Sequence, residues 1–126
     1  MSLKEQVDAE MARYRTLQEE VQVLATQRQQ YAQQASENTM VQQELDLLGD
    51  DAKVFKLIGP VLLKQDASEA KTNVKKRLEF INNELEKANK KIEQKEKDAV
   101  EIRKNIAQMQ MEMQKQAAAA ARSVVA

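Results

Sequence analysis

The feature that most limits how this chain can fold is a repeat of apolar residues in its C-terminal half. Spacings of four and three residues alternate along it, and eleven of the twelve positions are apolar, the exception being Lys95. This C-terminal seam consists of Val74, Leu78, Ile81, Leu85, Ala88, Ile92, Lys95, Ala99, Ile102, Ile106, Met109 and Met113. A stripe recurring every ~3.5 residues keeps facing one partner helix, so about six heptads of it predict a coiled coil.

The N-terminal half carries a weaker repeat of the same period. Its apolar positions, the N-terminal seam, are Leu3, Val7, Tyr14, Leu17, Val21, Leu24, Tyr31, Ala35 and Leu45, and the repeat is interrupted at Glu10, Arg28, Asn38 and Gln42. Polar seam residues usually lower stability while setting register or partner choice. A stretch that is simply solvated is an equally good explanation at this point.

Composition agrees with long helices and excludes several kinds of site. The 126 residues include only two Gly and one Pro, whereas Ala, Glu, Gln, Lys and Leu are abundant. Without Cys or His, zinc sites, disulfides and most nucleophilic triads are excluded. The formal net charge of zero gives no bias toward nucleic acid or acidic lipid. Because neither a secretory signal nor an apolar run of ~18 residues is found, we expect a soluble intracellular protein.

The two seams align if the chain reverses direction near Gly59. Leu45 then lies opposite Val74, and Tyr31, Leu24, Val21, Leu17 and Val7 follow opposite Ala88, Lys95, Ala99, Ile102 and Met113. Large and small residues face each other in several of these layers, as close packing requires. The alignment predicts an antiparallel coiled coil within one chain, although a shift of one heptad would also give some good layers.

The sequence predicts two helices, at residues 1–48 and 68–121. The helical period stops between them. Residues 53–66 are rich in apolar and β-branched side chains around Gly59-Pro60, which predicts a β-hairpin. Gly49 and the acidic residues after it favour the end of the first helix, while Asp66 to Glu69 offer a capping box or a Ser68 cap for the second. Pro60 cannot adopt positive φ, so the bend is not a type I′ turn. Residues 122–126 are predicted to be a flexible tail.

Both faces of the predicted hairpin are apolar. Alternation places Phe55, Leu57 and Leu62 on one face and Val54, Ile58, Val61 and Leu63 on the other. A two-stranded hairpin with two apolar faces and two open edges is marginal in water. The chain has no other convincing strand, so we expect strands from other subunits to cover it; the alternative is that the hairpin folds back onto its own coiled coil.

Two sequence runs carry a resemblance to a known family. VFKLIGPVLLKQ at Val54 to Gln65 and EAKTNVKKRLEFI at Glu69 to Ile81 closely resemble the β-type subunits of prefoldin, most of all the eukaryotic subunit 6 group. Further matches are Glu37-Asn38 and the run from Val41 to Leu45. The resemblance spans nearly the whole chain, and the single hairpin matches the β-type rather than the two-hairpin α-type subunits.

The resemblance implies a mainly α fold, with a long antiparallel two-helix coiled coil and one central β-hairpin that joins an intersubunit β-barrel. Prefoldin is a heterohexamer of two α-type and four β-type subunits, so the implied partners are two α-type and three further β-type subunits. It holds unfolded polypeptides, such as nascent actin and tubulin, without ATP and delivers them to the group II chaperonin of the cytoplasm. No cofactor is implied. The implied assembly residues are Val54, Phe55, Leu57, Ile58, Gly59, Pro60, Val61, Leu62 and Leu63.

Client binding is expected at the ends of the two helices that lie far from the hairpin. The candidates are apolar residues near both termini: Leu3, Val7, Met11, Met109, Met111, Met113, Val124 and Val125. Methionine is flexible and polarisable, which suits a surface that must adapt to many sequences. Met109 and Met113 are also seam positions, for which packing between the helices is the favoured interpretation, whereas Met111 lies off the seam. The Ala-rich run from Ala117 to Ala121 could continue the helix or fray.

Other functions find less support in the sequence. Lys75-Lys76-Arg77 resembles a nucleic-acid patch, but Glu69 and Glu79 flank it and no aromatic residue interleaves it. Paired acids on a coiled coil lack the concave pocket of an active site, so we expect no enzyme activity. A structural coiled-coil adaptor that spaces or tethers partners is the alternative function, and it would have polar helix ends and a hairpin that is only a connector.

Overall fold

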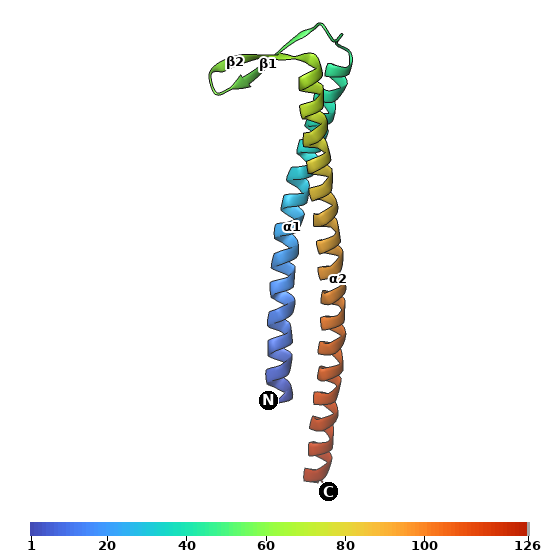
Figure 1. The fold of residues 1–126 in the computed structure, drawn as a ribbon. Coiled ribbons are helices and arrows are strands. Elements are labelled where there is room, and N and C mark those ends of the chain that lie inside the picture. The colour runs from blue at the N-terminus through green and yellow to red at the C-terminus, as the bar shows by residue number, and fades with distance from the viewer. Residues whose placement is uncertain (126) are drawn as a thin grey trace. The chain divides into compact units, whose positions relative to one another are not determined.

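The computed structural model describes residues 1–125, which form two long helices separated by a hairpin (Figure 1). The elements are α1 (Leu3–Asp46), β1 (Lys53–Ile58), β2 (Val61–Asp66) and α2 (Ala67–Val125). The chain divides into two compact units. Unit 1 combines Met1–Ala25 with the chain from Lys90 onward, and unit 2 is Thr26–Asn89. Neither helix has, within residues 1–125, an apolar stretch long enough to cross a membrane.

The helix boundaries follow local hydrogen bonding. The Ser2 hydroxyl accepts a hydrogen bond from the backbone N–H of Glu5 at 3.1 Å, an N-cap that satisfies one of the free donors of the first turn of α1. After Asp46, the N–H groups of Leu47 and Leu48 bond to carbonyls three residues earlier, which tightens the last turn. α2 continues to Val125, past the predicted end of the helix at residue 121. The predicted flexibility of residues 122–126 stays a prediction, and Ala126 lies outside the described residues.

In unit 1, the predicted seam positions of both helices face inward. Val7 and Ile102 are 7% and 3% exposed, and Ile92 and Ala99 are also buried. The polar seam residue Lys95 is half-buried and forms an ion pair with Glu20 of α1. Glu10 is half-buried as well. Its carboxylate pairs with Arg13 at 2.7 Å, and its second oxygen, Oε2, is buried without a hydrogen-bond partner.

In unit 2, the seam is continuous with the hairpin. Ile81 is only 2% exposed, and Leu45, Leu78 and Ala88 are also buried. Leu45 and Val74 line the same cavity, as the predicted register requires. Two of the polar seam residues, Asn38 and Gln42, are half-buried, whereas Arg28 is exposed and donates a hydrogen bond to Asn89 at 3.3 Å. Except at Arg28, therefore, the polar interruptions lie within the packed seam rather than in a solvated stretch.

The hairpin pairs β1 with β2 in antiparallel register, with Ile58 opposite Val61 and Leu57 opposite Leu62. The loop is therefore only two residues long, Gly59 and Pro60. Gly59 has φ of 56°, a conformation that glycine adopts without the steric cost paid by other residues. No atom lies near the position of an added Cβ, so the requirement for glycine comes from the backbone and not from lack of space.

The connection from α1 to β1 is fixed by a lysine at the start of α2. The ammonium of Lys71 donates a hydrogen bond to the carbonyl of Leu48 at 3.1 Å and lies 3.9 Å from the carboxylate of Asp50. In the same connection, the N–H of Ala52 donates a hydrogen bond to the carbonyl of Gly49 and closes a turn. These contacts hold the end of α1 beside the start of α2, from which the hairpin projects (Figure 1).

Candidate functional site

The hairpin presents apolar side chains to solvent on both faces. One face, the Phe55 face, carries Phe55, Leu57 and Leu62 with Lys53, Lys64 and Asp66, and the other, the Val54 face, carries Val54, Ile58, Val61 and Leu63 with Lys56 and Gln65. Leu57 and Leu62, a directly opposed pair, are 67% and 63% exposed. Each of the predicted assembly side chains except Val54 is exposed. This division into faces is the one that the sequence predicted.

The base of the hairpin lies against the helices. Val54 and Gln65 are half-buried. With Phe55 and Lys56 they line a cavity of about 160 Å³, whose other side is formed by helix residues such as Val41, Leu45 and Val74. β1 and β2 form a two-stranded sheet, so within residues 1–125 both outer edges lack a partner strand. The hairpin therefore does not fold back over its own helices beyond this base, and its exposed faces and edges are free to pair with other chains.

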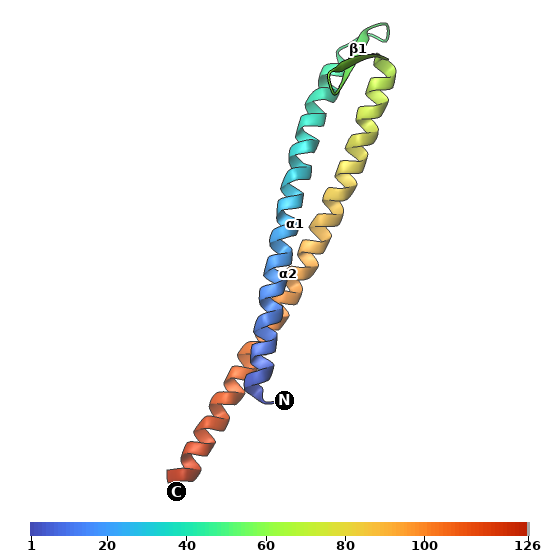
Figure 2. The same cartoon turned by 90° about the vertical axis from the view of Figure 1, so that its left-hand side faces the viewer.

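The predicted client-binding residues differ in how far unit 1 exposes them. Met11, Met111 and Val124 are exposed, whereas Leu3, Met109 and Met113 are half-buried and Val7 is buried. The burial of the last four follows from their seam positions, where they pack between the helices. The last part of α2 continues beyond the first residue of α1, and residues 114–124 are all exposed (Figure 2). The side chain of Val125 lies outside the part that the structure describes.

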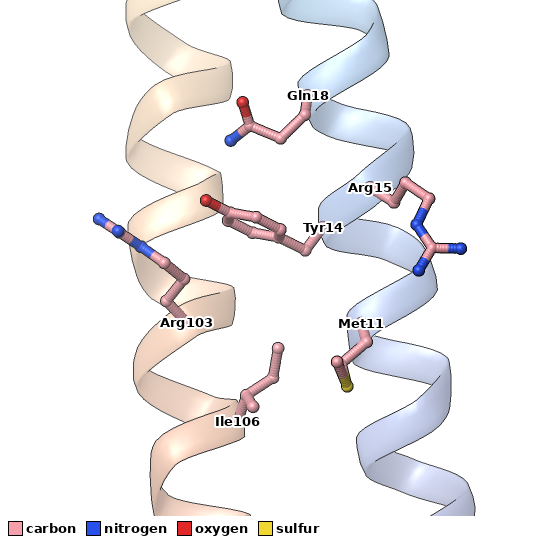
Figure 3. Close-up of a pocket in the computed structure, with 6 residues that line it drawn as sticks. All are labelled: Met11, Tyr14, Arg15, Gln18, Arg103 and Ile106. Carbon is pink, nitrogen blue, oxygen red and sulfur yellow. The ribbon is translucent and has the colours of Figure 1, made fainter.

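Beside the seam of unit 1 lies a groove, the Met11 groove, with a volume of about 370 Å³. Its lining combines α1 and α2 and consists of Met11, Tyr14, Arg15, Gln18, Arg103 and Ile106. The Tyr14 ring extends from α1 toward α2, and Met11 and Ile106 face the gap next to it (Figure 3). Met11 was a predicted client-binding residue, and Tyr14 and Ile106 were predicted seam positions, but the groove itself was not predicted.

Several exposed apolar residues of unit 2 lie outside the predicted surfaces. They are Met40, Val41, Leu47, Leu48 and Phe80. None of the five is a seam position. An apolar residue off the seam was the one sequence signal that could have predicted their exposure. No group of three or more acidic side chains in residues 1–125 is arranged to hold a metal ion.

Comparison with known proteins identifies the family. The prefoldin subunit family matches residues 8–113. The chain belongs to this family. "Probable prefoldin subunit 6" of Drosophila melanogaster is 40% identical over 117 residues, 93% of this chain and 94% of that protein. "Prefoldin subunit 6" of Homo sapiens is 35% identical over 119 residues, which cover 94% and 92% of the two chains. The corresponding Arabidopsis thaliana protein is 45% identical over 87 residues, 69% and 67% of the two.

The fold also matches a solved prefoldin. The β subunit of prefoldin from Thermococcus strain KS-1 superposes with a TM-score of 0.75 over 80% of this chain and 89% of that chain, at 23% identity. The expected fold class is confirmed: two long helices joined by a central antiparallel hairpin. Prefoldin subunits assemble with one another and act as chaperones rather than enzymes, which gives this chain a chaperone-type role.

Proposed function

We propose that this chain is a subunit of a heterohexameric prefoldin, with two α-type and three further β-type partners, that holds unfolded polypeptides without ATP. Its clients include nascent actin and tubulin, which it delivers to the group II chaperonin of the cytoplasm. The observation that carries this proposal is the hairpin with two apolar faces and two open edges. The resemblance of the chain to prefoldin subunits 6 supports the choice of partners and clients.

Assembly is the role we assign to the hairpin. Shared strands would supply hydrogen-bond partners for both open edges, and facing sheets would bury Leu57, Leu62, Ile58 and Val61. Burial of one large aliphatic side chain contributes roughly 1.5–3 kcal/mol, so a barrel built jointly by several subunits would stabilise each hairpin that joins it. A hairpin that only connected two helices would not need apolar residues on both faces, which argues against the adaptor alternative.

Client holding is the role we assign to three exposed apolar residues of unit 1. Met11, Met111 and Val124 are exposed, lie off the packed seam and belong to the same unit. Thioether side chains adapt their shape to different apolar partners, which a holdase for many unfolded sequences requires. The half-buried Met109 and Met113 support the helix that presents Met111.

Replacement of Met11, Met111 and Val124 with Gln in the assembled complex is expected to weaken client holding. Three apolar contacts would be lost from this subunit, but the other subunits also hold clients, so we expect the complex concentration that halves client aggregation to rise about two- to fivefold. Light scattering of a chemically unfolded client diluted into buffer measures this directly.

The control replaces Val23 and Met40, which are also exposed apolar residues but lie elsewhere on α1, with Gln. This control variant is expected to suppress aggregation as the wild type does. Unchanged suppression by the triple variant, in a complex that still assembles, would show that these residues do not hold clients.

A further inference from the structure

The Met11 groove combines an apolar floor with a size suited to inserted side chains. Its volume of about 370 Å³ is within the range of roughly 300–1,000 Å³ that is usual for ligand pockets. Tyr14 supplies an aromatic face, while Met11 and Ile106 supply aliphatic and thioether surface beside it (Figure 3). An aromatic or large aliphatic side chain that entered between them would lose its contact with water on several sides at once.

The charged residues of the groove are both cationic. Arg15 and Arg103 line it from α1 and α2, and no carboxylate belongs to the lining. In Figure 3 their guanidinium groups point away from the gap, to opposite sides of it. Within residues 1–125 neither guanidinium takes part in a hydrogen bond or ion pair, whereas Arg13 of the same helix is paired with Glu10.

A second cavity of unit 1 has the opposite character. It is lined by Ala12, Arg13, Thr16, Leu17, Glu20 and Asp98, with a volume of about 360 Å³. Its two carboxylates are those of Glu20, which also pairs with Lys95, and Asp98. Positive charge without a counter-ion is therefore a property of the Met11 groove and not of this stretch of coiled coil as a whole.

We propose that the Met11 groove binds non-native segments in which an aromatic or aliphatic side chain is flanked on both sides by acidic residues. The apolar side chain would occupy the hollow between Tyr14, Met11 and Ile106, and the flanking carboxylates would pair with Arg15 and Arg103. Arginine donates two parallel hydrogen bonds to a carboxylate, so the pair of guanidiniums adds a charge preference to an otherwise unselective apolar contact. The proposal rests on the holding function and specifies which client segments this subunit takes.

The test compares two synthetic peptides on the assembled complex. Both have the central sequence Leu-Phe-Leu, flanked by three Asp on each side in one and by three Lys in the other, and fluorescence anisotropy measures their affinity. The acidic peptide is expected to bind more tightly, and the double variant Arg15→Gln, Arg103→Gln is expected to weaken its binding about fivefold while leaving the basic peptide unaffected or slightly better bound. The preference should shrink in about 0.5 M salt, where exposed charges are screened.

The control variant Lys4→Gln, Lys104→Gln removes the same amount of charge from unit 1 at exposed positions that do not line the groove. It should leave the affinity for the acidic peptide unchanged. A photo-crosslinking residue in place of Gln18 should label the acidic peptide, and the same residue in place of Thr16, on the second cavity, should not. Equal losses in the two double variants, or no preference between the peptides, would overturn the proposal. If aggregation suppression persists in either case, client holding stands without this preference.

Discussion

Replacement of Leu57 and Leu62 with Asp is expected to abolish incorporation of this chain into a prefoldin complex. The two residues are directly opposed on the hairpin and are the most exposed leucines of its strands. If a shared barrel buries both, their loss removes roughly 3–6 kcal/mol of apolar burial, and two unpaired carboxylates would have to leave water as well. We therefore expect association with partner subunits to weaken by at least about 100-fold.

Co-purification with tagged partner subunits measures this loss, and circular dichroism shows whether the helices remain. The control variant Val23→Asp, Val100→Asp changes two exposed apolar residues of unit 1 in the same way and should still assemble. Normal assembly of the hairpin variant would contradict the assignment of these side chains to the subunit interface.

Replacement of Ile102 with Ala is expected to destabilise the coiled coil of unit 1. Ile102 is 3% exposed on the seam, so the change removes buried methyl groups and leaves a cavity, at a cost of about 2–4 kcal/mol. Because the loss is local, hydrogen exchange of the assembled complex is the suitable measurement, and amides of unit 1 near residue 102 should exchange about 30- to 1,000-fold faster.

Val100→Ala is the matched control for this change. Val100 lies on the same turn of α2 and is 41% exposed, so its truncation should alter the free energy of opening by less than about 0.5 kcal/mol. If the two variants exchanged equally fast, the seam defined by residues 74–113 would not be what joins the helices of unit 1.

The seam and the hairpin faces could be predicted because each follows from a period in the sequence. A repeat of 3.5 residues assigns Ile81 and Ile102 to an inward stripe without any knowledge of the partner helix. Alternation by two likewise assigns Leu57 and Leu62 to one face once the loop is known to be short. The same seam pattern explains why Val7 is buried, although Val7 was also a predicted client-binding residue.

The Met11 groove could not be predicted because it depends on three-dimensional detail. Arg15 and Arg103 line one groove only because of the antiparallel register, which the sequence determines to no better than one heptad. Periodicity predicts that Tyr14 is more buried than Met11, but the hollow between Met11, Tyr14 and Ile106 depends on side-chain directions that periodicity does not give. The hydrogen bond from Lys71 to Leu48 joins an α2 side chain to a loop carbonyl. It could not be predicted either, because it too depends on how the side chain is directed in three dimensions.

At the end of α2, helix propensity and packing against α1 point in different directions. Ala117 to Ala121 favour helix, whereas residues 114–124 are all exposed, so packing gives little support there. The predicted helix ends at residue 121, whereas α2 continues to Val125. Alanine propensity favours helix as far as residue 121, and in the last turn the Ser123 hydroxyl donates a hydrogen bond to the carbonyl of Ala120 at 3.2 Å.

The central claim is that this hairpin requires strands from other subunits. Size-exclusion chromatography with multi-angle light scattering tests it most directly. The isolated chain at micromolar concentration is expected to form a distribution of self-associated species, because its apolar faces and open edges would pair with each other. Mixed with the two α-type and three further β-type partners, it should give one monodisperse peak with the mass of a heterohexamer. A stable monomer of 14.4 kDa that does not associate with those partners would contradict this claim.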